Sequence, residues 1–281
     1  MRFKTILLIT SLLILATCVS AQDFQSIDKK INVPSGKTLK MVIQIDAGEV
    51  FAKKHAHSAQ VAVSGKINKK FDNLEINYNK KSNEISVFLD HDKWLKSTRQ
   101  NQSSKIQIFL PDDIIIEFSS EIKAGKINFD IGGLSLKNFE LRTTAGEVAI
   151  TFDEANQIPM EFLDIDIKIG SAKLSHLGNA RFEDGRINGG IGELEIDFRG
   201  KGSNSAHADI DLDMGSTKVI LPRDLGIKLR STTFGFLTDS NVSREFERRG
   251  RYYFSQNYDK QSRTLSLAIH SGIGELDVYF R

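Results

Sequence analysis

The residues of this chain that could do chemistry include a row of three aspartates. Asp209, Asp211 and Asp213 alternate along one stretch, so in a strand their side chains would share one face. Such a row could bind calcium or serve a polysaccharide-cleaving enzyme built on a β-helix. The row lies beside Gly215, where a solvated outer face would also carry acids, and no two carboxyl groups stand out as an acid and base pair. We favour the solvated face and predict no catalytic residue.

Two histidines could serve as metal ligands. His55 and His57 would also share one face of a strand, from which two imidazoles could bind zinc or copper. The sequence offers no obvious third ligand, and the preceding Lys53 and Lys54 oppose a cation. We predict no metal site.

Other chemical signatures are absent from the sequence. Gly190 and Gly192 lack the third glycine and the following helix of a dinucleotide-binding fingerprint, and there is no Walker sequence. Neither G-x-S-x-G nor H-E-x-x-H occurs, and Cys18 is the single cysteine. We therefore predict no cofactor and no enzymatic activity.

A segment rich in arginine and aromatic residues, 244–258, is the best candidate for partner binding. Arginine and tyrosine are frequent at interaction hot spots, and exposed aromatic rings can stack on sugars. The same segment could instead be a cap that packs its rings over the end of the fold. The candidate binding residues are Arg244, Arg248, Arg249, Arg251, Tyr252 and Tyr253.

The elements that must position these residues are β-strands. Apolar and polar residues alternate in 105–110, 193–198 and 264–269, which is the period of a strand with one buried face. No long segment shows a helical period, and the four prolines all stand beside turn-like stretches. The chain is predicted to be all-β.

An internal repeat specifies how the strands are arranged. The segments GGIGELEIDFR and SGIGELDVYFR are near-copies, and the central glycines of the copies from 125 to 235 are 21, 24, 22, 23 and 20 residues apart. Fixed spacing of this size is typical of a solenoid, so we predict a single-stranded β-helix with coils of about 20–24 residues. The copies are centred on Gly125, Gly146, Gly170, Gly192, Gly215 and Gly274, with an early copy at Gly48 and a degraded late copy at Gly235.

Alignment of the copies on their glycines predicts the core. The residues two and four positions after each glycine are mostly apolar, and so is the residue directly before it, which predicts three core columns. Because the alternation changes phase at the glycine, the chain is expected to turn a corner there. One position after the glycine, opposite charges are adjacent and like charges are separated by serine, and three positions after it the sign alternates from Lys173 to Glu195 to Lys218, as stacked coils require. The column before the glycine contains Ala124, Ala145, Ile169, Ile191, Met214 and Ile273.

Two stretches interrupt the repeat, and we predict both to be insertions into one solenoid domain of residues 22–281. Residues 68–104 resemble a hairpin with a polar loop, and residues 239–263 contain the arginine-rich and aromatic segment. Insertions into a solenoid bind partners or cover an end that would otherwise be an open strand edge.

The first residues predict export. Residues 1–21 combine Arg2 and Lys4, an apolar run and small residues before Gln22, which is the pattern of a signal peptide. A lipobox-like stretch ending at Cys18 offers lipidation as the alternative. We predict a bacterial periplasmic, cell-surface or secreted protein without a membrane span after cleavage. The formal charge of +2 comes from residues 1–21, and a neutral mature chain argues against nucleic acid as a partner.

The segment from Ile31 to Leu39, followed by Asp46-Ala47-Gly48-Glu49-Val50 and the repeated glycine turns, resembles a known family. The chain is similar to the toast-rack, or putative-adhesin, β-solenoid domains of bacterial envelope proteins. These are related to the C-terminal domain of cell-wall-active antibiotic response proteins. Stretches 108–111 and 219–222 look like that family's strand-then-proline steps. The resemblance covers nearly all of residues 28–281, and it implies a right-handed coil, an exported location and no catalytic residues.

These observations predict a non-catalytic, exported envelope protein that acts as an adhesin-like structural or recognition solenoid. The expected partner is an envelope protein or a cell-surface glycan. One alternative is a regulatory sensor component of an envelope-stress response. The other is the polysaccharide-active β-helix enzyme suggested by the aspartate row.

Overall fold

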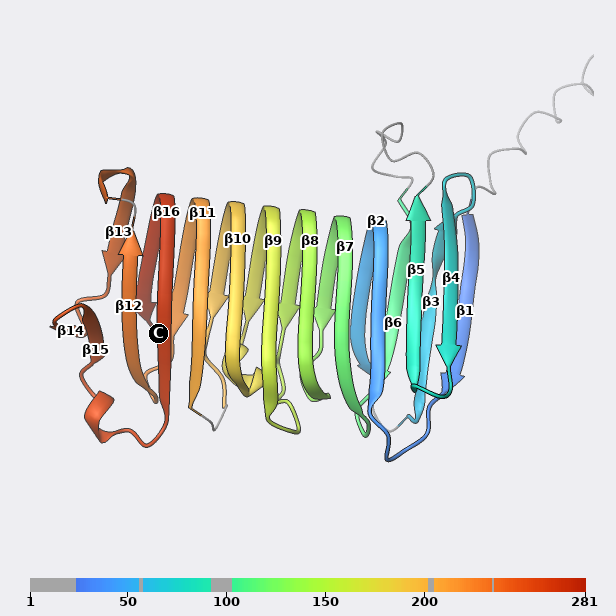
Figure 1. Ribbon diagram of the computed structural model, residues 1–281, viewed down its shortest axis with the longest axis horizontal. Helices are drawn as coiled ribbons and strands as arrows, with labels where there is room; N and C mark the ends of the chain where they lie inside the picture. Colours follow the sequence, from blue (N-terminus) through green and yellow to red (C-terminus); the bar gives the residue numbers. More distant parts are fainter. Residues whose placement is uncertain (1–23, 56–57, 92–102, 202–204, 234) are drawn as a thin grey trace, which may run out of the picture.

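The computed structural model describes residues 24–55, 58–91, 103–201, 205–233 and 235–281. Their strands form one 16-stranded sheet, in which the long central strands run parallel (Figure 1). The predicted all-β class is therefore confirmed. The predicted signal peptide, residues 1–21 with Cys18, lies outside the described residues.

Helical structure in the described ranges is limited to short 3-10 turns, and none of these helices is long and apolar enough to cross a membrane. The elements are β1 (Phe24–Asn32), β2 (Leu39–His55), β3 (Gln60–Asn68), β4 (Asp72–Asn79), β5 (Glu84–His91), β6 (Lys105–Pro111), β7 (Ile115–Asp130), β8 (Ser135–Thr151), β9 (Met160–Ser175), η2 (Leu177–Ala180), β10 (Phe182–Asp197), β11 (Ala206–Leu221), β12 (Gly226–Thr233), η3 (Gly235–Leu237), β13 (Thr238–Val242), β14 (Phe246–Arg249), β15 (Tyr252–Ser255), η4 (Tyr258–Lys260) and β16 (Thr264–Phe280).

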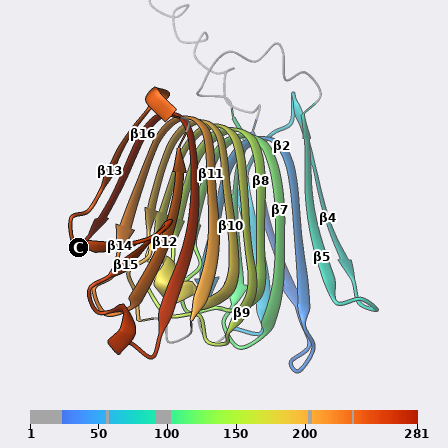
Figure 2. The ribbon, with the colours of Figure 1, turned by 60° about the vertical axis from the view of Figure 1, so that its left-hand side comes forward.

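Seven long strands, β2, β7 to β11 and β16, each of 16 or 17 residues, make the body of the molecule. Each bends near its middle, so the sheet folds over on itself into a solenoid-like stack (Figure 2). We call the part of each long strand before its bend the first leg and the part after it the second leg. Neighbouring strands pair in parallel along both legs, so one coil stacks on the next.

The core lies between the two legs. Phe118 in the first leg of β7 packs edge-on against Phe129 in its second leg, with ring centroids 5.5 Å apart, and stacks on Phe139 of β8 at 5.3 Å. The predicted columns two and four residues after the glycines are buried, which confirms both. The buried members in the central coils are Ile127, Phe129, Val148, Ile150, Ala172, Leu174, Leu194, Ile196, Thr217 and Val219.

A ladder of stacked glycines makes the bend possible. Each has a φ between 133° and 157°, which L side chains rarely adopt. From Gly125 onward, a Cβ built on any of them would lie 1.7 to 2.1 Å from the carbonyl oxygen of the glycine in the neighbouring strand. Both constraints exclude every other residue type. The ladder consists of Gly48, Gly125, Gly146, Gly170, Gly192, Gly215 and Gly274.

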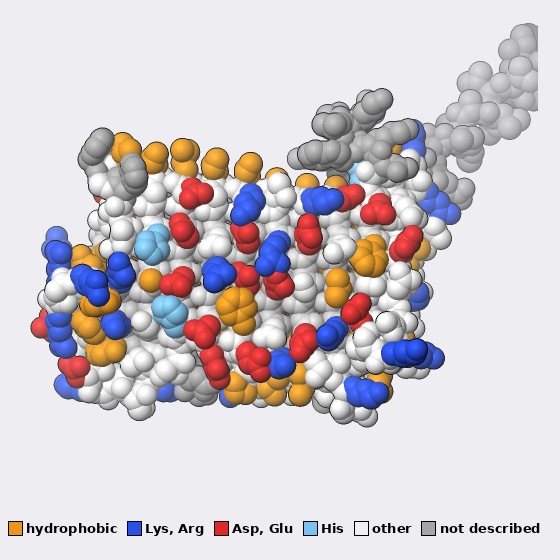
Figure 3. Space-filling model, in the orientation of Figure 1, with side chains coloured by type: hydrophobic (Ala, Val, Ile, Leu, Met, Phe, Trp, Pro, Cys, Tyr) orange, Lys and Arg blue, Asp and Glu red, His pale blue; other side chains and the backbone are white. Residues whose placement is uncertain are grey.

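The prediction that the column before the glycine fills the core was wrong. Ile169 and Ile191 are each 52% exposed and Met214 is 45% exposed. In β7, inward-facing positions end at Ile122 and resume at Ile127, so the bend takes up the four residues between them. The residue before each glycine therefore points outward, and Figure 3 shows the resulting row of hydrophobic side chains along the folded edge of the sheet.

The coils do not follow one another in sequence order at the C-terminal end. Strand β16 lies between β11 on one side and β12 and β13 on the other. Thr238, not Gly235, is the partner of Gly274, and Gly235 lies in η3 with a φ of 58°. The degraded copy at Gly235 is thus outside the glycine ladder. Strand β16, which contains the regular copy at Gly274, lies next to β11 in its place.

Each end of the stack has the same design. At one end β5 and β6 pair with the two legs of β2, and at the other β12 and β13 pair with the two legs of β16. Beyond them the pairing becomes antiparallel, through β1, β3 and β4 at one end and β14 and β15 at the other. The described parts of the two stretches predicted as insertions thus continue the sheet, and short or charged strands occupy its edges.

Buried polar side chains organise the loops opposite the bends. Asn156 accepts a hydrogen bond from the backbone of Leu136 at 2.9 Å and donates one back to its carbonyl at 2.7 Å. Asp197, which is 6% exposed, accepts hydrogen bonds from Arg199 Nε at 2.9 Å and Nη2 at 2.7 Å. These contacts replace backbone pairing where the strands end.

Replacing Gly192 with alanine is expected to destabilise the protein by at least about 3 kcal/mol. The new Cβ would lie 1.7 Å from the Gly170 carbonyl oxygen, at a φ of 146°. Urea unfolding followed by circular dichroism measures the loss. Gly36→Ala is the matched control, because Gly36 has a φ of 80° but no atom within 4 Å of a Cβ. It should lose only about 1 kcal/mol, and equal losses would contradict the stacking explanation.

Replacing Asp197 with asparagine is expected to cost about 1.5 to 3 kcal/mol at neutral pH. Burial alone would raise the pKa of Asp197, but the hydrogen bonds from the Arg199 side chain and backbone outweigh it and lower that pKa. Because the folded-state pKa is depressed, the stabilisation is complete above the ordinary carboxyl pKa of about 4 and is lost as the pH falls through the lowered pKa. Unfolding curves between acidic and neutral pH test this.

The control for that measurement is Asp184→Asn, at an exposed position in β10. Because this side chain is exposed, its replacement should change the free energy of unfolding little. A cost for Asp197→Asn that stayed constant down to the most acidic pH would contradict an electrostatic origin.

Candidate functional site

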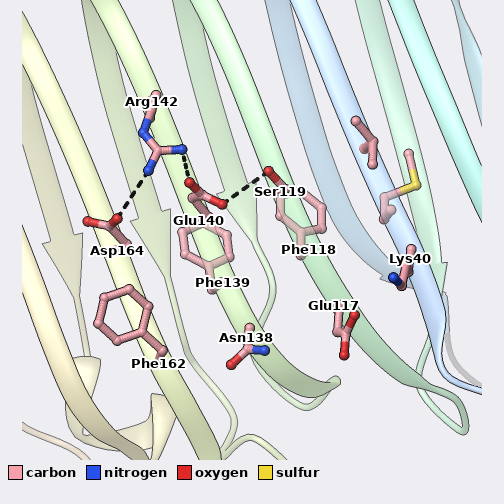
Figure 4. Close-up of a pocket in the computed structure, with 12 residues that line it drawn as sticks. Lys40, Glu117, Phe118, Ser119, Asn138, Phe139, Glu140, Arg142, Phe162 and Asp164 are labelled. Atoms are coloured by element: carbon pink, nitrogen blue, oxygen red, sulfur yellow. Dashed lines mark hydrogen bonds and ion pairs between the residues drawn. The ribbon is translucent and has the colours of Figure 1, made fainter.

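A shallow concavity of about 440 Å³ lies on the outer face of the first legs of β2, β7, β8 and β9. Figure 4 shows the residues around it: the polar side chains and Phe162 stand at outward-facing positions of neighbouring strands, whereas Phe118 and Phe139 belong to the core beneath. Because the strands are in register, the residues form rows across the sheet. One row joins Lys40, Glu117, Asn138 and Phe162, and the next joins Val42, Ser119, Glu140 and Asp164.

Phe162 is the feature that separates this concavity from the rest of the face. It stands at the outward phase of β9, eight residues before Gly170, and its side chain is half-buried. The same position in every other long strand carries a polar residue: Lys40, Glu117, Asn138, Asp184, His207 and Ser266. An apolar ring in an otherwise polar row has no partner in the core, so its position calls for another explanation.

An ion-pair network lies beside the ring. Arg142 contacts Glu140, and its Nη2 lies 3.4 Å from Asp164 Oδ2. Ser119 Oγ donates to Glu140 Oε2 at 3.3 Å. The pairs fix the orientation of the guanidinium and both carboxylates, so polar atoms are held in place around the concavity.

Asp164 is desolvated although it faces outward. Its exposed fraction is 7%, and its Oδ1 has no hydrogen-bond partner among the described residues. A buried acceptor without a partner costs free energy. Figure 4 shows that this carboxylate is next to Phe162 along β9, at the rim of the concavity.

A β-bulge shapes the lower part of the site. Between Ile116 and Glu117 the register with β8 shifts, so Lys137 is the extra residue. Lys137 Nζ lies 3.2 Å from Glu117 Oε1 and 3.9 Å from Glu161 Oε2. At the bulge, Lys137 of β8 therefore links β7 and β9 and neutralises Glu117 and Glu161.

The charges at this site are matched. Lys137 and Arg142 pair with the acids around them, which leaves polar groups but no strong local excess of either sign. Such a site suits a neutral ligand with many hydroxyl groups. Carboxylates, an amide and a guanidinium can hydrogen-bond to hydroxyls, and the ring can stack on the apolar face of a sugar.

A second concavity, of about 560 Å³, lies on the outer face of the second legs. Its lining contains no aromatic residue and is dominated by an ion-pair ladder, with Lys173 and Lys218 at 3.2 and 3.6 Å from the Glu195 carboxylate. Lys126 and Glu147 lie 3.7 Å apart. The predicted alternation of charges between neighbouring coils is confirmed, and it accounts for this face as a stabilised, solvated surface.

The predicted partner-binding residues lie in residues 243–263, which cover the C-terminal end of the stack and which we call the cap. Arg248 and Arg249 are in β14, Tyr252 and Tyr253 are in β15, and Arg244 and Arg251 are in the adjoining loops. Tyr253 packs on Phe246, which contacts Phe280 at 4.8 Å, so this ring helps to cover the core.

Most of the cap arginines are engaged within the cap. Arg249 pairs with Glu247 and Asp259, both at 2.9 Å, while Arg248 lies over Tyr253 at 5.8 Å and Arg251 over Tyr252 at 5.3 Å. Arg244, Arg248 and Arg251 form no ion pair within the described ranges. Partner binding through this segment stays a prediction.

The aspartate row and the histidines do not converge. Asp209, Asp211 and Asp213 are exposed on the open outer face of the first legs, with His207 Nε2 at 3.3 Å from Asp209. His55 is exposed, and His57 lies outside the described residues. In the part of the chain that the structure describes, no group of three or more histidine, cysteine, aspartate or glutamate side chains could hold a metal ion.

Two family descriptions match the chain. The N-terminal domain of the toast-rack family matches residues 20–175. The C-terminal domain of LiaF, described as a cell wall-active antibiotics response protein, matches residues 168–278. The two matches meet within β9, in the middle of the continuous sheet. A search of curated proteins finds no match.

Solved structures resemble the protein only distantly. A putative cell adhesion protein from Clostridium sporogenes is 15% identical with a TM-score of 0.47, over 92% of this chain and 100% of its own. A putative adhesin from Bacteroides fragilis is 13% identical with a TM-score of 0.44, over 91% of this chain and 97% of its own. A likeness this distant assigns neither a function nor a partner to this chain.

The toast-rack match covers more than half of the sequence and includes four of the seven glycines of the ladder. The LiaF-like match covers the other three. The protein therefore belongs to the toast-rack family.

Proposed function

We propose that this protein is a non-catalytic, adhesin-like recognition protein of the bacterial envelope that binds a neutral glycan through the concavity around Phe162. The observation that carries the proposal is the half-buried ring of Phe162 in a row that is otherwise polar. Around it, carboxylates and an arginine are held by ion pairs, and Asn138 contributes an amide. Together these groups provide the stacking surface and the hydrogen-bonding groups that a saccharide needs.

The arrangement supports recognition better than hydrolysis. Glycosidases need two carboxyl groups with separate roles, one protonated and one ionised. At this site Glu140 and Asp164 share the guanidinium of Arg142, so both carboxylates are engaged in ion pairs and neither stands apart in a separate role. The exposed aspartates of β11 lie on the outer face of the first legs, so among the described residues this row lends the polysaccharide-active alternative no support.

Export, a single domain spanning residues 22–281 and a right-handed coil belong to the same proposal. The resemblance to exported envelope domains supports the location, and the strong preference of parallel strand crossovers for one hand supports the coil. Proteolysis of the secreted protein followed by mass spectrometry would locate the mature N-terminus and show whether Cys18 carries lipid.

Replacing Phe162 with alanine is expected to weaken glycan binding at least about tenfold while leaving thermal stability almost unchanged, because the ring faces away from the core. Isothermal titration calorimetry with neutral oligosaccharides of glucose, mannose and N-acetylglucosamine measures the affinity. The matched control is Phe51→Ala, at a half-buried outward position on the second leg of β2. Equal binding by the Phe162 and Phe51 variants, or no binding by the wild type, would reject the proposal.

The regulatory alternative has one specific observation in its favour. The match to the LiaF C-terminal domain, residues 168–278, includes the whole cap with its six predicted binding residues. If the cap engages a protein of an envelope-stress response, the arginines without ion pairs are the groups free to meet acidic side chains.

Replacing Arg244, Arg248 and Arg251 together with alanine is then expected to change the induction of an envelope-stress reporter as much as deleting the gene does. The variant should lose little of its unfolding temperature, since none of the three makes an ion pair among the described residues and only the ring contacts of Arg248 and Arg251 are removed. Tyr253→Ala is the control, because it should lower that temperature by removing packing on Phe246. An unchanged reporter in the deletion strain would exclude the regulatory role.

A further inference from the structure

The folded edge of the sheet carries a concentration of exposed apolar side chains. Of the seven large hydrophobic residues exposed in the described ranges, four directly precede a ladder glycine: Ile169, Ile191, Met214 and Ile273. A fifth, Leu237, precedes Thr238, the register partner of Gly274. Single exposed apolar residues are ordinary, but five in adjacent coils form a continuous ridge.

We define the crest as the row of residues directly before the ladder glycines. The row is in register from strand to strand and runs along the upper edge in Figure 3. Its side chains change in size along the stack, since three alanines are followed by four large residues. In order across the sheet, the crest is Ala47, Ala124, Ala145, Ile169, Ile191, Met214 and Ile273.

The charges that flank the crest also change along the stack. In β2, which begins the crest, both flanking residues are acids, Asp46 and Glu49. Over β7 to β9, the residues two before and one after each glycine include the bases Lys123, Lys126 and Lys168 and one acid, Glu147. Lys123 pairs with Asp46 and Lys126 with Glu147 within the same chain. Over β10, β11 and β16 the charged residues at the same positions are all acids. They are Glu193, Asp213 and Glu275, and all three are exposed.

We propose that the crest is the interface of a reversible homodimer, in which a second copy of this chain packs on it in the antiparallel direction. A twofold axis crossing the crest between β9 and β10 sets each strand against one from the other half of the second copy. Ile169 then faces Ile191 of the second copy, Ala145 faces Met214, and Ala124 faces Ile273. Every large side chain away from the axis thus meets an alanine, so the two ridges interlock.

The same operation matches the flanking charges. Lys126 and Glu275 each follow their glycine, so they lie on the same side of the crest and face one another across the interface. Asp213 faces Thr144 and lies between Lys123 and Lys168 of the second copy. Glu147 and Glu193 face Ser216 and Ser171, so along β7 to β16 no like charges are directly opposed. Two contacts oppose the dimer and keep it weak: Glu147 lies between Glu193 and Glu275 of the second copy, and Glu49 of β2 faces Asp239.

The size of the contact indicates a weak dimer. Six strands, β7 to β11 and β16, spaced about 4.8 Å apart make a ridge about 24 Å long. With its flanking residues it buries roughly 400 Å² on each copy, about half of a standard interface. An anionic lipid surface fits less well, because the three acids lie beside the large apolar side chains and would be brought close to lipid phosphates.

Sedimentation velocity of the purified protein over a wide range of concentration tests the proposal. The wild type should show a monomer–dimer equilibrium, and Ile191→Ser combined with Met214→Ser should raise the dissociation constant roughly tenfold or more. Ile115→Ser is the matched control, since Ile115 is 42% exposed but lies at the start of β7, away from the crest. It should leave the equilibrium unchanged.

Charge reversal supplies a second, independent measurement. Lys126→Glu and Glu275→Lys should each weaken self-association, whereas an equimolar mixture of the two variants should recover it. In the mixed dimer one contact joins the two introduced side chains and the other joins the two native ones. Thermal unfolding verifies that both variants are folded.

Three results would overturn the proposal. The first is a wild type that stays monomeric over the whole range, and the second is a variant mixture that fails to recover. The third is a monomeric wild type that binds vesicles of phosphatidylethanolamine and phosphatidylglycerol and loses this binding in the Ile191→Ser, Met214→Ser variant. That result would assign the crest to lipid.

Discussion

The structure depends on the close stacking of glycine backbones at the bend. A sheet folds in two only if every coil turns at the same place, and here adjacent coils approach so closely that a Cβ would meet the neighbouring carbonyl oxygen at 1.7 to 2.1 Å. The required φ excludes other residues independently. Once the turn is fixed, the two legs need only alternate apolar and polar residues to enclose a core. This explains why the glycines recur strictly while their neighbours vary in size and charge.

Local pattern predicted the parts of the fold that are local. The columns two and four after each glycine, the parallel stacking and the alternating charges follow from spacing and period alone. The column before the glycine was misassigned because alternation does not reveal how many residues a bend consumes. The position of β16 could not be predicted, since the sequence of a strand does not show which distant segment it will pair with. Phe162 could have been found, because aligning the repeats shows one apolar residue in a polar column.

The surfaces of the protein divide by how their polar groups are used. On the second legs, lysines and glutamates neutralise one another from coil to coil and need no ligand. In the cap, tyrosines and most arginines are engaged in packing and ion pairs. The first-leg concavity differs because its ion pairs surround an aromatic ring that the core does not use. The crest differs again. Its apolar side chains point outward because the bend that encloses the core turns the residue before each glycine away from it.

The inner position of β16 has a consequence for how the chain reaches its folded state. In a solenoid whose coils follow sequence order, each new coil can add to the one before it as the chain emerges. Here β12 and β13 are made before β16, yet they can pair with the stack only after β16 has filled the place between them and β11. Until the last residues are available, β11 is an open edge that could recruit the wrong strand. Completion of the fold therefore waits for β16, and a chain that ended before it would lose an interior layer together with the strands that pair with it.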